Sequence, residues 1–465
     1  MFIGRERELA VLETAFSSGA SAFLPIYGRR RVGKSELILR FMRGKPGVYF
    51  LGKQSAAHLQ IREFLQEAAG LLAEPLLATF PADGWKSALL AVTGRWRGSE
   101  KLILAFDEFQ WMAEASPDLP SVLQERWDRE WKASGRVVLI LCGSYVGFME
   151  REVLGARSPL FGRRTGQILL KPFGYLEAGA FHPQYSLVDR ARAYFICGGI
   201  PLYLRNFSEK RSVEANIAET LLDEYGPLHR EPDFLLREEL RDVHNYYGVL
   251  LAVAHRHLTN REISEQTGVG ERSLHYYLKQ LCDLGYLAQR YPLTGAAPTA
   301  RHVRYVLDDP LLRFWFRFVY PNTSYLRQMG PSRAMADRIR PDLPSYFGSC
   351  FEQLCREALP SLYRKEGSAV ASQVGEYWDK KTQIDVVGYR DDGWTDLGEC
   401  KWGQVRGAPA IMAELEEKVA CYPNPRNATI GRRIFTRQRL TSGKIAGKAR
   451  CHCLDDLYDP SLAER

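Results

Sequence analysis

Residues 28–35 read Gly-Arg-Arg-Arg-Val-Gly-Lys-Ser, and the spacing of these residue types suits the binding of a triphosphate. Glycines at these places let backbone N–H groups turn inward around phosphate oxygens. We expect Lys34 to contact the β and γ phosphates of ATP and the Ser35 hydroxyl to bind Mg²⁺. The apolar run 22–27 and the amphipathic run 36–42 predict the strand and helix that must flank such a loop. The predicted nucleotide-binding residues are Gly28, Arg31, Val32, Gly33, Lys34, Ser35 and Glu36.

Two carboxylates, Asp107 and Glu108, end an apolar run that begins at Lys101. In enzymes with this phosphate loop, the first carboxylate holds the magnesium shell and the second orients or activates the attacking water. Taken alone, an Asp-Glu pair after a strand is more often a solvated strand end. Behind a phosphate-binding loop it predicts an ATPase, with Asp107 in the metal and nucleotide site and Glu108 as a catalytic residue.

A third group of residues that could do chemistry lies toward the C-terminus and consists of Asp385, Glu399 and Lys401. Residues 383–389 and 395–402 each predict a strand, with a short turn between them. Because side chains alternate along a strand, Glu399 and Lys401 share a face, and pairing through the turn places Asp385 beside them. Two carboxylates then bind one or two Mg²⁺ ions, and Lys401 positions water or neutralises developing charge. The pattern predicts phosphodiester hydrolysis; the alternative is a surface ion pair of little energetic effect.

The elements that must position these residues belong to a chain of 465 residues, a length that predicts about three domains. Hydrophobic residues at 45% and charged residues at 25% exclude a largely disordered protein. The net charge of +8 suits a polyanionic partner, either nucleotide or nucleic acid. Without a membrane-spanning run or a secretory signal, the protein is expected in the cytoplasm.

Strand and helix patterns alternate through residues 1–180, which predicts an α/β fold with a parallel sheet. We expect its strands near 22–28, 47–51, 101–107, 136–143 and 166–171. The chain then divides into segments of different pattern. These are a helical lid at 181–240, a winged helix at 241–308, a helical linker at 309–345 and a second α/β domain at 346–465.

The winged helix-turn-helix is predicted from the order of a helix, a capped helix, a further helix and two short strands. One face of the last helix should pack inward, and it carries Leu274, Tyr277, Leu278, Leu281 and Leu284. The opposite face is then free to enter the major groove of DNA. Winged helices also mediate protein contacts, so DNA binding rests on likeness of fold. The predicted DNA-contacting residues are Arg272, Ser273, His275, Tyr276 and Lys279.

Together these motifs resemble the archaeal-type ATPases of the STAND and AAA+ radiation, P-loop proteins with a winged helix and a nuclease-like C-terminal domain. The matching stretches include residues 2–9, the phosphate loop, LILAFDEFQW, LILCGS, SPLFGRRTG and GGIPLYL. The resemblance implies that residues 2–5, with Ile3 and Arg5, flank adenine and that Ser144 is a sensor on the fourth strand. It also implies a homo-oligomer, such as a ring, because an arginine finger usually comes from a neighbouring subunit. The candidate fingers are Arg163 and Arg164, although paired arginines in a loop are commonly just solvated.

Residues 346–465 resemble the PD-(D/E)XK nuclease superfamily, whose pattern is a helix carboxylate, then Asp, then Glu-x-Lys. The resemblance assigns Glu352 as the helix carboxylate and places it with Asp385 and Glu399 around the metal. The function expected of the chain is therefore ATP-dependent DNA binding with a magnesium-dependent nuclease. The alternative is a nucleotide-switched regulator whose nuclease-like domain binds DNA or protein without cutting.

Overall fold

A computed structural model of the chain describes residues 2–297, 299, 302–368, 370–405, 407–440 and 449–462. The chain divides into two compact units, Met1–Pro172 and Phe173–Arg465. Each unit contains a five-stranded β-sheet. In the described ranges, no helix is both long and apolar enough to cross a lipid bilayer. The finer division of the second unit into lid, winged helix, linker and nuclease-like domain stays a prediction.

The sheet of the first unit has the strand order β2-β3-β4-β1-β5, and its neighbouring strands are all parallel. This arrangement confirms the predicted α/β fold. Because the strands are parallel, their carboxyl ends lie along one edge, where Tyr27 and Asp107 end their strands. The strands are β1 (Ala22–Tyr27), β2 (Gly47–Leu51), β3 (Leu102–Asp107), β4 (Val137–Gly143) and β5 (Ile168–Leu169).

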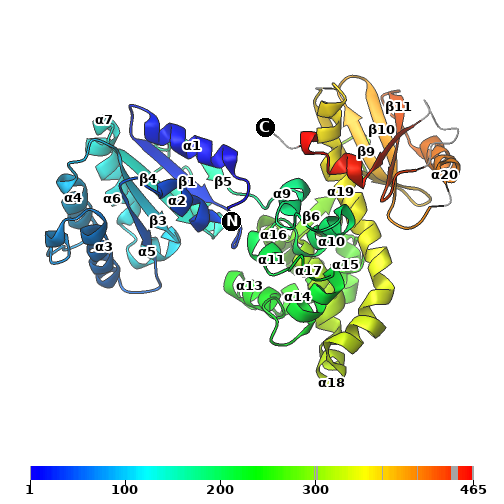
Figure 1. The fold of residues 1–465 in the computed structure, drawn as a ribbon, viewed down its shortest axis with the longest axis horizontal. Helices are drawn as coiled ribbons and strands as arrows, with labels where there is room; N and C mark the ends of the chain where they lie inside the picture. Colours follow the sequence, from blue (N-terminus) through cyan, green and yellow to red (C-terminus); the bar gives the residue numbers. More distant parts are fainter. Residues whose placement is uncertain are drawn as a thin grey trace. The chain divides into compact units, whose positions relative to one another are not determined.

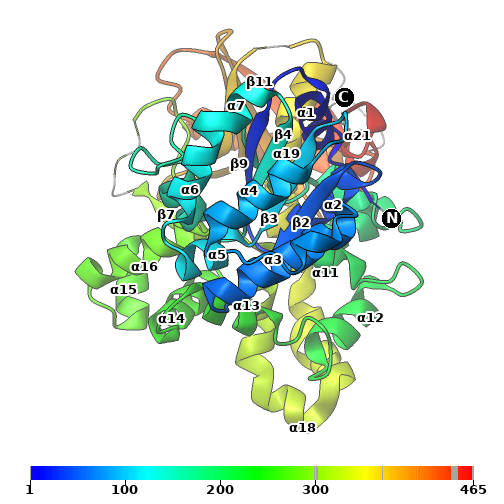
Figure 2. The ribbon, with the colours of Figure 1, turned by 90° about the vertical axis from the view of Figure 1, so that its left-hand side faces the viewer.

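Helices cover both faces of this sheet (Figure 1). One face packs on α3, α4 and α6 through a cluster that includes Phe50, Phe64 and Phe106. Figure 2 shows α3 and α4 from outside this face. On the other side, α1 packs on α2 through Phe16 and Phe41. The helices are α1 (Glu6–Ser17), α2 (Lys34–Met42), α3 (Ala57–Leu71), α4 (Trp85–Arg95), α5 (Phe109–Ala115), α6 (Leu119–Arg126), α7 (Lys132–Ser134) and α8 (Val146–Phe148).

The second unit begins with helices, in agreement with the helical pattern predicted over residues 181–240. Three further helices follow, and then β6 (Leu287–Arg290) pairs antiparallel with β7 (Arg304–Leu307). Leu258 forms an isolated antiparallel β-bridge with Tyr305 of β7, so the chain just before α15 also pairs with this hairpin. The helices are α9 (Tyr175–Gly179), α10 (Leu187–Cys197), α11 (Pro201–Arg205), α12 (Val213–Ile217), α13 (Glu231–Glu239), α14 (His244–Val253), α15 (Asn260–Thr267), α16 (Glu271–Asp283), α17 (Pro310–Phe314) and α18 (Thr323–Ala334).

The C-terminal sheet has the order β12-β11-β10-β9-β8, with β8, β9 and β10 antiparallel and β10, β11 and β12 parallel. The long helix α19 runs along the sheet and contacts β8, β9 and β10, whereas α20 contacts β10 and β11 (Figure 1). The elements are α19 (Leu343–Lys365), β8 (Ser372–Trp378), β9 (Gln383–Arg390), β10 (Trp394–Lys401), α20 (Ala408–Cys421), β11 (Thr429–Thr436), β12 (Arg450–Cys453) and α21 (Leu454–Leu457).

Candidate functional site

The loop between β1 and α2 turns sharply through backbone conformations that favour glycine. Gly28, Arg31 and Gly33 have φ values of 152°, 67° and 95°. These turns carry the chain from the end of β1 into the start of α2 at Lys34. The first backbone N–H groups of a helix lack partners within the helix, and together with the helix dipole they attract anions. The loop therefore has the strand, turn and helix arrangement expected of a phosphate site.

Gly28 is required by packing as well as by conformation. A Cβ at this position would lie 2.2 Å from the backbone oxygen of Leu170. We expect Gly28→Ala to lower the free energy of unfolding by about 1–3 kcal/mol, the usual cost of overpacking. Gly19→Ala is the matched control, because nothing lies within 4 Å of a Cβ built there. Urea unfolding of both variants measures the effect, and equal stabilities would contradict this close approach.

Lys34 lies inside the loop. Its Nζ donates hydrogen bonds to the backbone oxygens of Gly28 and Arg29, both at 2.9 Å. The side chain is buried, and this burial lowers the pKa of Lys34. A cation is thus held in the loop by backbone carbonyl groups. Among the described residues it has no ion-pair partner, so it can turn toward an incoming phosphate without breaking an ion pair.

Ser35 and Asp107, predicted from distant motifs, are in contact. The Ser35 hydroxyl donates to Asp107 Oδ2 at 2.5 Å, and the Tyr49 hydroxyl donates to the same oxygen at 2.7 Å. Asp107 is fully buried. Its other oxygen accepts from the backbone N–H of Glu108 at 2.9 Å. The hydroxyl and the carboxylate expected at a magnesium site therefore lie side by side; Tyr49, at the centre of an apolar strand, was not predicted.

Glu108 is oriented by two neighbours. The Ser144 hydroxyl, just after β4, donates to Glu108 Oε2 at 2.7 Å. Gln110 Nε2 donates to the same oxygen. The backbone of Glu108 has φ 48°, the left-handed region, which turns the chain away from β3. The predicted catalytic and sensor residues thus share a hydrogen-bond network, and Gln110 is a member that the motif reading missed.

The two candidate arginine fingers differ in their contacts. Arg163 makes a bidentate ion pair with Asp128, through Nε at 3.0 Å and a terminal nitrogen at 2.8 Å. Arg164 is exposed, and its hydrogen bond to the backbone oxygen of Leu154 is long at 3.5 Å. Arg164 would therefore break fewer contacts than Arg163 in order to act as an arginine finger. Near the N-terminus, Arg5 donates to the backbone oxygen of Val32 at 3.2 Å and so contacts the phosphate loop.

In the second unit, Asp385, Glu399 and Lys401 meet on two neighbouring strands. The β9–β10 register pairs Val386 with Gly398, so Asp385 and Glu399 are the next opposed residues and share a face. Asp385 Oδ2 accepts from the backbone N–H of Cys400 at 3.0 Å. Lys401 Nζ donates to Glu399 Oε1 at 2.8 Å. The three residues predicted from strand periodicity are therefore brought together.

The carboxylates of this group are crowded. Burial, together with the charge of Asp385, raises the pKa of Glu352 on α19 to about 8. Burial also raises the pKa of Asp385, and burial with the charge of Asp385 raises the pKa of Glu399. Burial alone would lower the pKa of Lys401, but its hydrogen bonds to Glu399 and Glu414 raise it. Buried acids that repel each other in this way are stabilised by a nearby cation.

A hard divalent cation fits the donor chemistry of Asp385 and Glu399, because Mg²⁺ prefers carboxylate oxygens. Across the described ranges, no group of three or more His, Cys, Asp or Glu residues is arranged to hold a metal ion. A cation here would therefore take these two carboxylates from the chain and complete its shell with other oxygens. The role of Glu352 as a further ligand stays a prediction.

Lys418, on α20, was not predicted for this site. Its Nζ donates to Glu399 Oε2 at 2.6 Å, so each oxygen of Glu399 accepts from a lysine. Lys418 also lies 3.2 Å from Glu414. In the sequence, Glu414 and Lys418 are an i,i+4 pair of the kind found on many solvated helices, so the pattern alone does not indicate a site.

The predicted DNA-contacting face of α16 points outward. Leu274, Leu278 and Leu281 are buried, as the helical spacing predicts. Tyr277 and Leu284, predicted to pack inward with them, are only half-buried. The five candidate contact residues are all exposed: Arg272, Ser273, His275, Tyr276 and Lys279.

The family comparison agrees with the ATPase motifs, and its match runs past the first unit, which ends at Pro172. Residues 2–207 match a family described as an ATPase domain predominantly from Archaea. Residues 315–412 match a second family, described as archaeal and bacterial proteins of unknown function. The second match includes Glu352, Asp385, Glu399 and Lys401. The chain therefore combines an archaeal-type P-loop ATPase domain with a C-terminal region whose family has no assigned function.

Relatives of the chain are found among archaeal proteins. It is 26% identical over 426 residues to the uncharacterized protein MJECL04 of Methanocaldococcus jannaschii, covering 90% of this chain and 92% of that one. The Walker-type ATPase PABY2304 of Pyrococcus abyssi has 21% identity and a TM-score of 0.47, covering 68% of this chain and 96% of its own. The ORC2 protein of Aeropyrum pernix, solved as ADPNP and ADP complexes, has 15% identity and a TM-score of 0.40, covering 72% and 93%.

Proposed function

We propose that the chain is an ATP-dependent DNA-binding protein with magnesium-dependent nuclease activity. The observation that carries the nuclease proposal is the meeting of Asp385, Glu399 and Lys401 on β9 and β10. The order α19, β8, β9, β10, α20, β11 agrees with the helix and strand pattern of the PD-(D/E)XK nucleases. Phosphodiester hydrolysis is the chemistry that this residue set serves best.

In the ATPase site each residue has a separate task. Lys34 and the backbone N–H groups of the loop neutralise the phosphate charge. Ser35 and Asp107 would hold the magnesium of the Mg-ATP substrate. Glu108, oriented by Ser144 and Gln110, accepts a hydrogen bond from the attacking water and fixes its position. The contact between Ser35 and Asp107 supports these assignments.

In the proposed nuclease site the carboxylates would bind the cation, and the lysines supply positive charge. Mg²⁺, when bound, supplies a Lewis acid that polarises the phosphodiester. Asp385 and Glu399 bind it, while Lys401 stabilises negative charge that develops on the phosphate oxygens. Lys418 orients Glu399 and favours its ionised form, because it donates to the carboxylate oxygen that Lys401 does not contact.

The segment from α14 to β7 supplies the DNA contacts in this proposal. Three helices followed by an antiparallel hairpin, with Leu258 bridged to Tyr305, agree with a winged helix. The exposed face of α16 would enter the major groove.

A direct test incubates the purified full chain with linear, circular and single-stranded DNA, with Mg²⁺ or Mn²⁺ and with or without ATP. We expect cleavage that needs the metal and is blocked by EDTA, together with a mobility shift of DNA under non-cleaving conditions. If every substrate stays intact in every combination, the nuclease proposal fails.

One observation favours a second candidate, a nucleotide-switched regulator that binds DNA or protein without cutting. Both oxygens of Glu399 accept hydrogen bonds from lysines, which compete with a metal for that carboxylate. The same assay separates the candidates, because a regulator would shift DNA in an ATP-dependent way and leave it uncut.

We also propose that ATP hydrolysis needs a neighbouring copy of the chain, which donates Arg164. Its exposure and single long hydrogen bond support this role over Arg163, which is paired with Asp128. Arg164→Ala and Glu108→Ala proteins are each expected to lose ATP turnover. Mixing them should restore part of it, because one mixed interface joins an intact Glu108 to an intact Arg164. A mixture as inactive as its components would contradict a shared site.

A further inference from the structure

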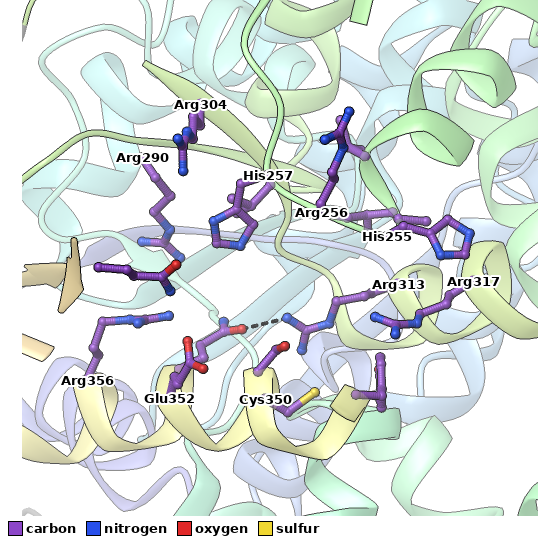
Figure 3. Close-up of a pocket in the computed structure, with 18 of the residues that line it drawn as sticks. His255, Arg256, His257, Arg290, Arg304, Arg313, Arg317, Cys350, Glu352 and Arg356 are labelled. Atoms are coloured by element: carbon purple, nitrogen blue, oxygen red, sulfur yellow. Dashed lines mark hydrogen bonds between the residues drawn. The ribbon is translucent and has the colours of Figure 1, made fainter. Parts of the chain in front are cut away.

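A cavity of about 390 Å³ lies in the second unit, between the β6–β7 hairpin and α19. Six arginines line it, whereas its lining contains only two carboxylates, Glu262 and Glu352. Figure 3 shows Arg256, Arg290 and Arg304 on one side of the cavity and Arg313, Arg317 and Arg356 on the other. The lining therefore has a formal excess of four positive charges.

Most of these charges are not neutralised by the protein. In the described ranges, ion pairs within 4.0 Å join only Arg290 to Asp308, at 2.9 Å, and Arg356 to Glu376, at 3.9 Å. The buried Nε atoms of Arg313 and Arg317 have no hydrogen-bond partner. Guanidinium groups held so close together repel each other, and burying their donors unsatisfied costs free energy. An anion in the cavity would remove both penalties.

The guanidinium groups are nevertheless held in place. Arg313 and Arg317 lie over the ring of Tyr346, with 5.8 Å and 5.6 Å between guanidinium carbon and ring centroid. A terminal nitrogen of Arg313 donates to Gln353 Oε1 at 2.8 Å (Figure 3). Arg304 lies 4.7 Å from the ring centroid of Trp378. Stacking orients the planar groups and leaves their edges free to bind phosphate oxygens in pairs.

The cavity borders the carboxylate site, although Asp385 and Glu399 are not among the residues that line it. Glu352 and Arg356 line it. A terminal nitrogen of Arg356 donates to the backbone oxygen of Asp385 at 2.6 Å. An anion bound by these arginines would therefore lie next to the residues proposed to cut phosphodiesters. The volume of the cavity is near the lower end of the roughly 300–1,000 Å³ range of small-molecule sites. This volume suits one or two nucleotides rather than a double helix.

We propose that this arginine pocket binds consecutive phosphates of a single nucleic-acid strand and leads that strand to Asp385 and Glu399. The proposal rests on the proposed nuclease function for its choice of ligand and deepens it by naming the substrate class. Single strands and unpaired ends enter the pocket, and fully paired duplex does not.

The test measures binding of a fluorescent single-stranded oligothymidylate to the full chain in EDTA, so that no cutting occurs, over a range of salt concentrations. The variants are the double substitution Arg313→Gln with Arg317→Gln, and Arg256→Gln at an exposed lining position. The control is Arg338→Gln. Arg338 also lies over a tyrosine ring, that of Tyr325, but is not among the residues that line the cavity.

The double variant is expected to bind at least about tenfold more weakly, since charge-assisted hydrogen bonds are lost. Its salt slope should fall by about 1.4, because each phosphate contact on a single strand contributes about 0.7. Arg256→Gln, which leaves the stacked pair intact, should lose about half of that slope. Arg338→Gln should bind like the wild type.

Three results would overturn the proposal. The variants could bind with the affinity and salt slope of the wild type. A blunt duplex could bind as well as the single strand and respond equally to the substitutions. Thymidine monophosphate could displace the strand at the concentration at which unlabelled strand does, which would assign the pocket to a free nucleotide. A chain that cuts no DNA but loses strand binding in these variants would refute the nuclease proposal and leave this one standing.

Discussion

Replacing Lys34 with alanine is expected to reduce ATP turnover by about 100-fold or more, the loss seen when a charge-stabilising group is removed from a transition state. Lys34 Nζ donates hydrogen bonds to two backbone oxygens of its own loop, at 2.9 Å, and among the described residues it forms no ion pair. Its charge is therefore available to the β and γ phosphates, where negative charge must be neutralised during transfer. Steady-state hydrolysis and binding of a fluorescent ATP analogue would measure the effect.

The control for this prediction is Lys53→Ala, which removes the same charge from the surface of the same unit. Lys53 is half exposed and pairs with Glu63, and exposed pairs of this kind contribute little to stability. We expect Lys53→Ala to hydrolyse ATP like the wild type. Unchanged turnover in Lys34→Ala would refute the assignment of this loop as the ATP site.

The fold of the first unit could be predicted because its signals are local. Strands β1, β3 and β4 are short apolar runs buried on both faces. The residue types of the loop at 28–35 place it between a strand and a helix. The contact between Ser35 and Asp107 also followed, because parallel strands bring their carboxyl ends to one edge. Tyr49 did not follow, since a tyrosine in an apolar strand carries no motif. Gln110 lies within the stretch LILAFDEFQW, but its residue type alone does not indicate a contact with Glu108.

The carboxylate site was predictable for the same reason, but only in part. Strand periodicity placed Asp385, Glu399 and Lys401 on one face before any helix was considered. Lys418 reaches Glu399 from α20, and the register of a helix against a sheet is set by packing that residue spacing does not encode. Glu352 could be assigned by resemblance; its raised pKa depends on burial, which appears only in three dimensions.

The arginine pocket had no signal in the sequence. Its six arginines are spread from residue 256 to residue 356, on a loop, two strands and three helical segments. Each is unremarkable in its own segment, because arginine is common on solvated surfaces. Their charges come together only when these separate segments pack around one cavity. Such a cluster follows from tertiary structure, and the modest net charge of +8 gives no indication of it.

Asp385→Asn is expected to reduce metal-dependent DNA cleavage by at least about 100-fold while leaving the fold intact. The carboxylate supplies the negative charge that a cation requires, whereas an amide supplies none. Asparagine has the same shape, and its Oδ1 can still accept the hydrogen bond that Cys400 N–H now donates at 3.0 Å. Because burial raises the pKa of Asp385, its charge costs free energy without a cation. The substitution should therefore not lower the free energy of unfolding measured in EDTA.

The matched control is Asp391→Asn, which makes the same chemical change on the exposed turn that follows β9. Both variants and the wild type would be compared on a labelled single strand over a range of Mg²⁺ concentrations. We expect Asp391→Asn to cut at the wild-type rate and Asp385→Asn to stay inactive even at high Mg²⁺ concentration. More Mg²⁺ cannot replace the negative charge of the missing carboxylate. If Asp385→Asn cuts as fast as Asp391→Asn, the cleavage arises at another site. Asp385 and Glu399 then belong to a structural cluster of charged residues.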